Sequence, residues 1–161
     1  MNSIITGDAL ELIPTLEDGS VALVVTSPPY PGQYGNHMEP LEWLQWMDHW
    51  LSLLAGKLTP SGVVVLNVMF RRTADGWFDS ALFGAGWTTA GLRLLDVYIY
   101  GKANPPPNGA LTYCDPPGWE FIFVLTKAKR PQDVTFNPVR RPYDRGSTRA
   151  YNGQPYSKHP T

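Results

Sequence analysis

The sequence predicts an α/β fold, in which a mostly parallel sheet has helices on both faces and an antiparallel pair of strands at one edge. Three observations lead to this prediction. Residues 20–26 and 63–68 are short, β-branched, apolar runs, typical of strands that are buried on both faces. Residues 39–58, which lie between them, have the periodicity of an amphipathic helix. Two further apolar runs, 88–100 and 120–126, have no helical pattern between them, which favours antiparallel pairing.

The elements at the N-terminus are predicted to be short. Ser3 to Ile5 has the pattern of a strand, and Ala9 to Leu16 has that of a short helix. Glu17 to Gly19 has the composition of a turn, which leads into the strand Ser20 to Thr26. Two prolines follow this strand closely, and because proline lacks the N–H group of a strand ladder, we expect the strand to end there.

The longest helix is predicted from about Glu39 to Leu58. Pro40 suits its first turn, and Thr59-Pro60-Ser61-Gly62 is expected to stop it. A second helix is predicted from Asp75 to Phe83, ended by Gly84-Ala85-Gly86. In the first helix, apolar residues recur at steps of three and four, which predicts a buried face made of Leu44, Met47, Leu51, Leu54 and Leu58.

The composition predicts one globular domain without a membrane span. Of the 161 residues, 43% are hydrophobic and 17% are charged. No apolar stretch reaches the roughly 18 residues of a membrane helix, and the N-terminus lacks the pattern of a secretory signal, so we expect a cytoplasmic protein. Cys114 is the only cysteine, which excludes internal disulfides and a thiolate zinc site. The histidines lack metal-ligand spacing, and no metal is expected.

The net charge of −1 conceals a basic C-terminal segment. Eight of the thirteen Lys and Arg residues, but only two of the fourteen Asp and Glu residues, lie in residues 127–161. We therefore divide the chain into residues 1–127 and a basic, proline-rich segment, residues 128–161. Its interleaved aromatic residues and cations suit stacking on bases and contact with phosphates, although a solvated basic tail is the alternative. The candidate nucleic-acid contacts are Arg140, Arg141, Arg145 and Arg149.

The most informative motif is the corner Ser27-Pro28-Pro29-Tyr30 after the strand Ser20 to Thr26. In an open α/β sheet, ligands bind at the carboxyl ends of the strands. A rigid corner at this place offers a hydroxyl, backbone carbonyls and an aromatic ring, which suit a flat base that carries an amino group. A sharp proline turn without a ligand, or a proline segment that binds an aromatic groove, is the alternative.

Together with other segments, this corner resembles the β-type DNA amino-methyltransferases, which methylate N4 of cytosine or N6 of adenine. The resemblance covers nearly the whole chain and implies a Rossmann-like fold, double-stranded DNA as a partner and S-adenosylmethionine as the cofactor. Residues 1–127 would then be the catalytic half-domain. The other matching segments are Gly7-Asp8-Ala9, Gly19-Ser20-Val21, Leu41-Glu42-Trp43-Leu44, Leu58-Thr59-Pro60-Ser61-Gly62, Gly101-Lys102-Ala103-Asn104-Pro105, the run from Trp119 to Lys127, and Ser157-Lys158-His159-Pro160-Thr161.

The resemblance also implies roles for individual residues. Ser27 Oγ and the Pro28 carbonyl would accept hydrogen bonds from an exocyclic amine and free its lone pair, while the Pro28-Pro29 pair holds both acceptors in place. Tyr30 would stack on a base flipped out of the duplex. Asp8, Ser27 and Tyr30 would contact the cofactor, although Asp8 also suits a helix N-cap. Serine at the first position is usual for N4-cytosine enzymes; N6-adenine methylation is the alternative.

The resemblance is incomplete at the cofactor site. In this family, a glycine-rich cofactor loop follows the His-Pro segment, and Phe83-Gly84-Ala85-Gly86 lacks its spacing. We therefore expect an incomplete fold that binds S-adenosylmethionine poorly by itself, because the helix N-terminus and glycine turn are missing. Three interpretations follow: a truncated or split enzyme, a site completed by a second chain or a homodimer partner, or a non-catalytic DNA-binding remnant.

Overall fold

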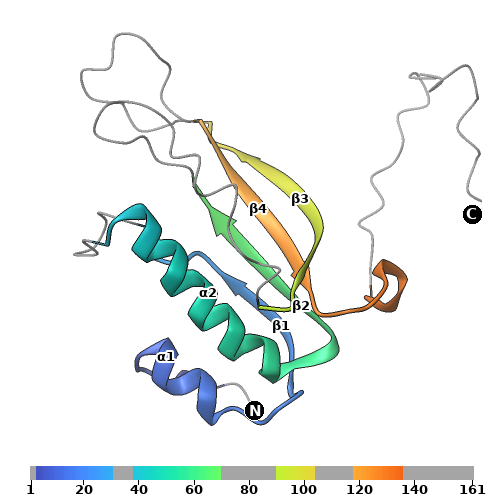
Figure 1. The fold of residues 1–161 in the computed structure, drawn as a ribbon. Coiled ribbons are helices and arrows are strands. Elements are labelled where there is room, and N and C mark those ends of the chain that lie inside the picture. The colour runs from blue at the N-terminus through green and yellow to red at the C-terminus, as the bar shows by residue number, and fades with distance from the viewer. Residues whose placement is uncertain (1–2, 31–37, 70–89, 104–117, 136–161) are drawn as a thin grey trace, which may run out of the picture.

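The structure is a computed structural model of the chain, and it describes residues 3–30, 38–69, 90–103 and 118–135. Figure 1 shows the order of the elements along the chain. They are α1 (Ala9–Leu12), β1 (Val21–Thr26), α2 (Pro40–Lys57), β2 (Leu58–Val68), β3 (Arg93–Gly101) and β4 (Trp119–Thr126), with 3-10 turns at Ile13–Thr15 and Pro131–Asp133.

The four described strands form one mixed sheet in the order β1-β2-β4-β3. β1 and β2 are parallel, and α2 connects them, so the three elements form a βαβ unit. β4 pairs antiparallel with β2 on one side and with β3 on the other. The predicted α/β class and its antiparallel edge are confirmed. Within the described residues the sheet has one parallel and two antiparallel pairs.

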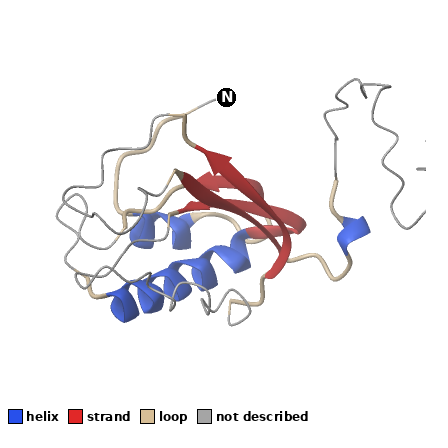
Figure 2. Ribbon diagram, turned by 90° about the horizontal axis from the view of Figure 1, so that it is seen from above, coloured by secondary structure: helices blue, strands red, loops and turns tan. Residues whose placement is uncertain are grey.

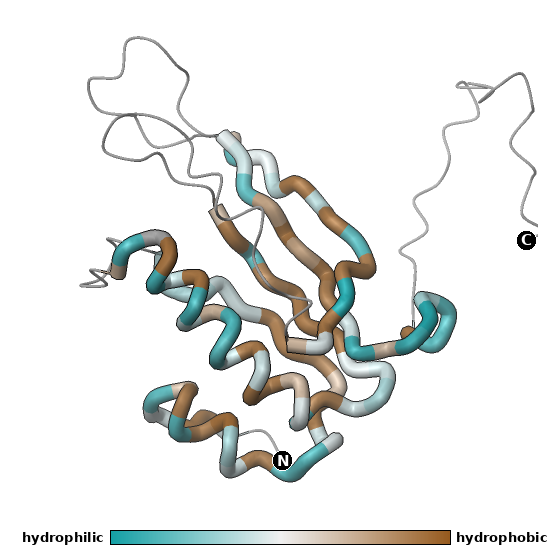
Figure 3. Tube along the Cα trace, in the orientation of Figure 1, coloured by the Kyte–Doolittle hydropathy of each residue, from teal (hydrophilic) through white to brown (hydrophobic). Residues whose placement is uncertain are grey.

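The core lies between α2 and the sheet. Figures 1 and 2 show α1 and α2 on the same side of the sheet, and Figure 3 shows apolar residues along the strands and polar residues on the outer side of α2. Burying one large apolar side chain contributes about 1.5–3 kcal/mol. Leu44 of the predicted helix face is only partly buried. The buried residues of α2 are Trp43, Met47, Trp50, Leu51 and Leu54, and they belong to one cluster with Leu58, Val64, Leu66, Val68 and Leu125.

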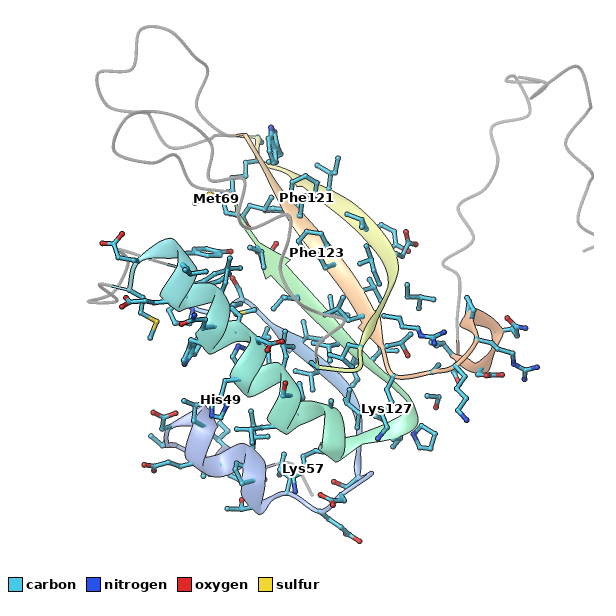
Figure 4. All side chains as sticks on the ribbon, in the orientation of Figure 1. His49, Lys57, Met69, Phe121, Phe123 and Lys127 are labelled. Atoms are coloured by element: carbon cyan, nitrogen blue, oxygen red, sulfur yellow. The ribbon has the colours of Figure 1, made fainter. Side chains whose placement is uncertain are left out.

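Side chains hold both ends of α2. At the start, a carboxylate oxygen of Glu42 accepts a 3.0 Å hydrogen bond from the Glu39 backbone N–H. At the end, Lys127 Nζ donates to the carbonyls of Ala55 and Leu58 at 3.1 and 2.9 Å. These carbonyls lack partners inside the helix, so the lysine satisfies groups that the helix leaves open. Figure 4 shows Lys57 and Lys127 near this end of α2.

Two expectations for the N-terminal strands are wrong. Ser3 to Ile5 forms no strand, and Ile4 is 99% exposed, because no described strand lies beside it to complete a ladder. β1 is not buried on both faces, since Leu23 and Val25 are 58% and 69% exposed. Val24 pairs with the core residue Val64, so Leu23 and Val25 face the other side of the sheet. The described helices do not cover that side.

Strand boundaries differ from the predicted ones. β2 begins at Leu58, so the residues predicted to stop the helix, 59–62, belong to the strand. β3 begins at Arg93 rather than Thr88, after a turn in which Gly91 has a φ of 73°. The predicted helix at 75–83 and the glycines at 84–86 lie outside the described residues.

Candidate functional site

The Ser-Pro-Pro-Tyr corner, residues 27–30, directly follows β1 at the carboxyl end of the parallel β1–β2 pair. Pro28 and Tyr30 are buried, whereas Ser27 and Pro29 are exposed. Within the described residues, the Pro28 carbonyl accepts no hydrogen bond. The corner therefore carries an exposed serine and a backbone carbonyl without a described partner at the sheet edge where α/β folds bind ligands, and two such acceptors suit a group with two N–H donors.

Trp43 fixes the second half of the corner. Its indole Nε1 donates a 2.7 Å hydrogen bond to the Pro29 carbonyl, and the side chain is 1% exposed. The first turn of α2 thereby determines where the corner lies. In the sequence, Trp43 belongs to the segment Leu41-Glu42-Trp43-Leu44 that resembles the family, and its aromatic side chain is typical of the core. A signal was available, because a buried tryptophan usually directs its N–H at an acceptor, but the sequence does not say which one.

Tyr30 points back into the molecule from the corner. Its side chain is 8% exposed, and its hydroxyl donates to the Asn67 carbonyl at 3.2 Å and lies 3.1 Å from Ser27 Oγ. Burial raises the pKa of this phenol above its usual value, although hydrogen bonding by Ser27 and by the Met69 backbone lowers it. Tyr30 is therefore a neutral phenol. Its predicted stacking on a flipped base is not tested by this geometry and stays a prediction.

A polar cluster of Asn67, Lys102 and Glu120 lies next to the corner. Asn67 Nδ2 donates a 2.5 Å hydrogen bond to Glu120 Oε2, and Lys102 forms an ion pair with the same carboxylate. Lys102 also donates to Met69 Sδ at 3.6 Å. Figure 4 shows Met69 at the same end of the sheet as Phe121. The sequence placed Lys102 and Glu120 in separate matching segments and did not indicate that they meet.

The charge of Glu120 is stabilised within this cluster. The side chains of Lys102 and Glu120 are 20% and 12% exposed. Burial alone would raise the pKa of Glu120, but hydrogen bonds from Lys102 and Asn67, together with the Lys102 charge, lower it below its usual value. Glu120 is therefore ionised. Asn67 Oδ1 is buried and has no partner among the described residues.

Of the other predicted site residues, Asp8 is the one that the structure describes. Asp8 caps α1, since its Oδ1 accepts a 2.8 Å hydrogen bond from the Leu10 N–H, and no described contact joins it to Ser27. Its predicted contact with a cofactor stays a prediction. The four arginines predicted to contact nucleic acid, Arg140, Arg141, Arg145 and Arg149, lie outside the described residues.

The part of the chain that the structure describes contains no group of three or more His, Cys, Asp or Glu side chains that is able to hold a metal ion. No helix in this part of the chain is both long and apolar enough to cross a membrane.

Comparison with known proteins identifies the family. The sequence profile of the N6/N4 family described as DNA methylase matches residues 21–161, which is most of the chain. The chain belongs to the DNA methylase family. This DNA methylase chain is 38% identical over 69 residues to the type II methyltransferase M.PvuII of Proteus hauseri and 37% identical over 70 residues to M.BglII of Bacillus subtilis. These alignments cover 40% and 42% of the chain.

Solved structures support the same family. PvuII DNA methyltransferase, which is described as cytosine-N4-specific, superposes with a TM-score of 0.67 at 19% identity over 76% of this chain. At that identity the match shows the fold. A DNA modification methylase of Thermus thermophilus is 26% identical over 86% of this chain, with a TM-score of 0.59. The predicted Rossmann-like methyltransferase fold is thus confirmed.

This DNA methylase chain spans only part of its relatives. It covers 20% of M.PvuII and 19% of M.BglII in the sequence alignments. In the structural superpositions it covers 48% of the PvuII enzyme and 56% of the Thermus protein.

Proposed function

We propose that this chain is the base-binding part of an S-adenosylmethionine-dependent DNA methyltransferase that methylates N4 of cytosine. The observation that carries the proposal is the corner itself, where the exposed Ser27 is followed at the carboxyl end of β1 by Pro28, whose carbonyl accepts no hydrogen bond from the described residues. Membership of the DNA methylase family and the likeness to a cytosine-N4-specific enzyme support it. The family also includes N6-adenine enzymes, so the choice of base belongs to the proposal.

The chemistry follows from what two acceptors do to an aromatic amine. The lone pair of such an amine is delocalised into the ring. Hydrogen bonds from both N–H groups to Ser27 Oγ and the Pro28 carbonyl hold the nitrogen in an orientation that frees this lone pair. Alignment of the nitrogen with the incoming methyl group contributes much of the rate. A neutral serine is a weak base, so the amine proton leaves to water after the new N–C bond has formed.

S-adenosylmethionine supplies an electrophilic methyl group on a sulfonium, and its loss of that methyl group balances the reaction. Two exposed polar residues are able to contact S-adenosylmethionine. They are Asp8 and Ser27, and one Asp8 carboxylate oxygen is not used by the N-cap bond. Asp8 and Ser27 would contact the cofactor directly. Tyr30 is buried and would act through Ser27.

Double-stranded DNA is the proposed partner. Arg140, Arg141, Arg145 and Arg149 are the proposed phosphate contacts. A second chain, or a second copy of this one, is also proposed to contribute to the cofactor site. If a second copy is required, activity should rise more steeply than linearly with protein concentration, whereas strict linearity would argue against it.

The decisive experiment is methylation of DNA with labelled S-adenosylmethionine, followed by nucleoside analysis. We expect N4-methylcytosine as the product, and we expect Ser27→Ala to reduce it strongly. Ser52→Ala is the matched control, because Ser52 is an exposed serine on α2. If N6-methyladenine were the only product, the cytosine assignment would be wrong. DNA binding without any methyl transfer or cofactor binding would instead indicate a non-catalytic remnant.

A further inference from the structure

We infer that Tyr30 is a positioning residue: its hydroxyl oxygen accepts a hydrogen bond from the Ser27 hydroxyl, so that the Ser27 oxygen offers only lone pairs to the substrate amine. The effect on the substrate amine rests on the proposed function, whereas the direction of the hydrogen bond follows from two distances and from the protons that the two hydroxyls carry. Ser27 Oγ lies 3.1 Å from Tyr30 Oη, and Tyr30 Oη lies 3.2 Å from the Asn67 carbonyl oxygen.

Counting protons determines the direction. A neutral phenol has one hydroxyl proton, and a backbone carbonyl can only accept. The bond between Tyr30 and Asn67 therefore uses the Tyr30 proton. The bond between Ser27 and Tyr30 must then be donated by Ser27, and the Met69 backbone N–H can likewise only donate to the phenol oxygen. The raised pKa of the buried Tyr30 phenol is consistent with this count, because it keeps the phenol protonated.

The acceptor that sets this direction is held in place. Asn67 pairs with Ile122 in the ladder between β2 and β4, and its side chain is bonded to Glu120. Lys102 in turn pairs with Glu120. The Tyr30 ring is buried in the core cluster, so its hydroxyl cannot turn freely toward water. Asn67 in β2, Glu120 in β4 and Lys102 after β3 thus keep the Tyr30 hydroxyl proton directed at the Asn67 carbonyl.

This arrangement determines what Ser27 can recognise. With its proton directed at Tyr30, Ser27 Oγ offers only lone pairs to the exposed side. These lone pairs match an amine N–H and repel the carbonyl oxygen that uracil or thymine carries in place of the cytosine amine. A site built to accept from a donor discriminates against a ligand without that donor, because an acceptor then faces another acceptor. Tyr30 is therefore inferred to contribute to base specificity as well as to orientation.

The first test removes only the hydroxyl, as Tyr30→Phe, in the intact protein. We expect kcat for methyl transfer to fall roughly two- to tenfold, with little change in KM for DNA, since a lost hydrogen bond of about 0.5–1.5 kcal/mol corresponds to such a factor. Tyr100→Phe is the matched control, because Tyr100 is 53% exposed. An active wild-type protein and an equally active Tyr30→Phe variant would overturn the positioning role while leaving the proposed function intact.

The second test needs no activity. The ionisation of Tyr30 can be followed by NMR through its Cζ resonance around the ordinary tyrosine pKa of about 10, in wild type and in Ser27→Ala. A hydrogen bond donated by Ser27 stabilises the phenolate, so its removal should raise the Tyr30 pKa. A lowered pKa in Ser27→Ala would mean that Tyr30 is the donor and would overturn the inference. If the wild type transferred no methyl group, the proposed function would fail, and this titration would still decide the direction of the bond.

Discussion

The indole N–H of Trp43 donates a 2.7 Å hydrogen bond to the backbone carbonyl of Pro29. The bond connects the first turns of α2 to the corner after β1, between residues 14 positions apart in the sequence. It fixes the corner from the helix side, while Tyr30 fixes it from the sheet side through the Asn67 carbonyl. The corner is therefore held both from the helix side and from the sheet side.

We predict that Trp43→Phe destabilises the protein by about 1–3 kcal/mol, because it removes a hydrogen bond and part of a buried ring. Chemical denaturation measures this change. Trp46→Phe is the matched control, since Trp46 is only partly buried. This substitution should lower the free energy of unfolding by less. Equal effects of the two substitutions would show that the bond to Pro29 contributes nothing measurable.

The Lys102–Glu120 pair predicts a dependence of stability on pH. The pKa of Glu120 is lower in the folded protein than its usual value of 4.5. Its ionised form therefore stabilises the fold above pH 4.5, and this stabilisation is lost as pH falls through the folded-state pKa. The free energy of unfolding of the Glu120→Gln variant should therefore fall less over that acidic range than that of wild type. Denaturation at a series of pH values measures this difference.

A suitable control for this titration is Glu11→Gln, because Glu11 is exposed on α1. This variant should decline with acid in the same way as wild type. A Glu120→Gln curve parallel to the wild-type curve would show that the cluster does not favour the charged carboxylate.

The two lysines near the end of α2 should differ in importance. Lys127 donates to two backbone carbonyls, so Lys127→Met should cost about 1–3 kcal/mol in thermal or chemical denaturation. Lys57 pairs with the exposed carboxylate of Asp18 at 2.6 Å, and such surface pairs contribute little. Lys57→Met should therefore be the milder change. The opposite order would contradict the capping role of Lys127.

The basic segment predicts a salt-dependent contribution to DNA binding. Replacing Arg140, Arg141, Arg145 and Arg149 together by glutamine should weaken binding and flatten the plot of log affinity against log salt, by about 0.9 for each lost phosphate contact. Arg130→Gln is the control, because Arg130 is paired with Asp133. An unchanged slope in the fourfold variant would remove these arginines from the DNA interface.

Local pattern was enough to predict most of the elements. The helix predicted from Glu39 to Leu58 is α2, Pro40–Lys57, because amphipathic periodicity and a proline in the first turn act over short distances. The strand Glu120 to Thr126 is found within one residue, as β4. The prediction of a strand from Ser3 to Ile5 is wrong because a strand needs a neighbouring strand, and such a short segment does not specify one.

The candidate site divides in the same way. The sequence by itself determined the corner, since prolines and a following aromatic ring after a strand restrict the backbone locally. Only the tertiary structure decided that Tyr30 turns inward to Asn67, that Trp43 holds Pro29, and that Lys102 meets Glu120. These contacts join residues from different elements, and their partners depend on strand order and register, which the local backbone preferences of the sequence do not specify.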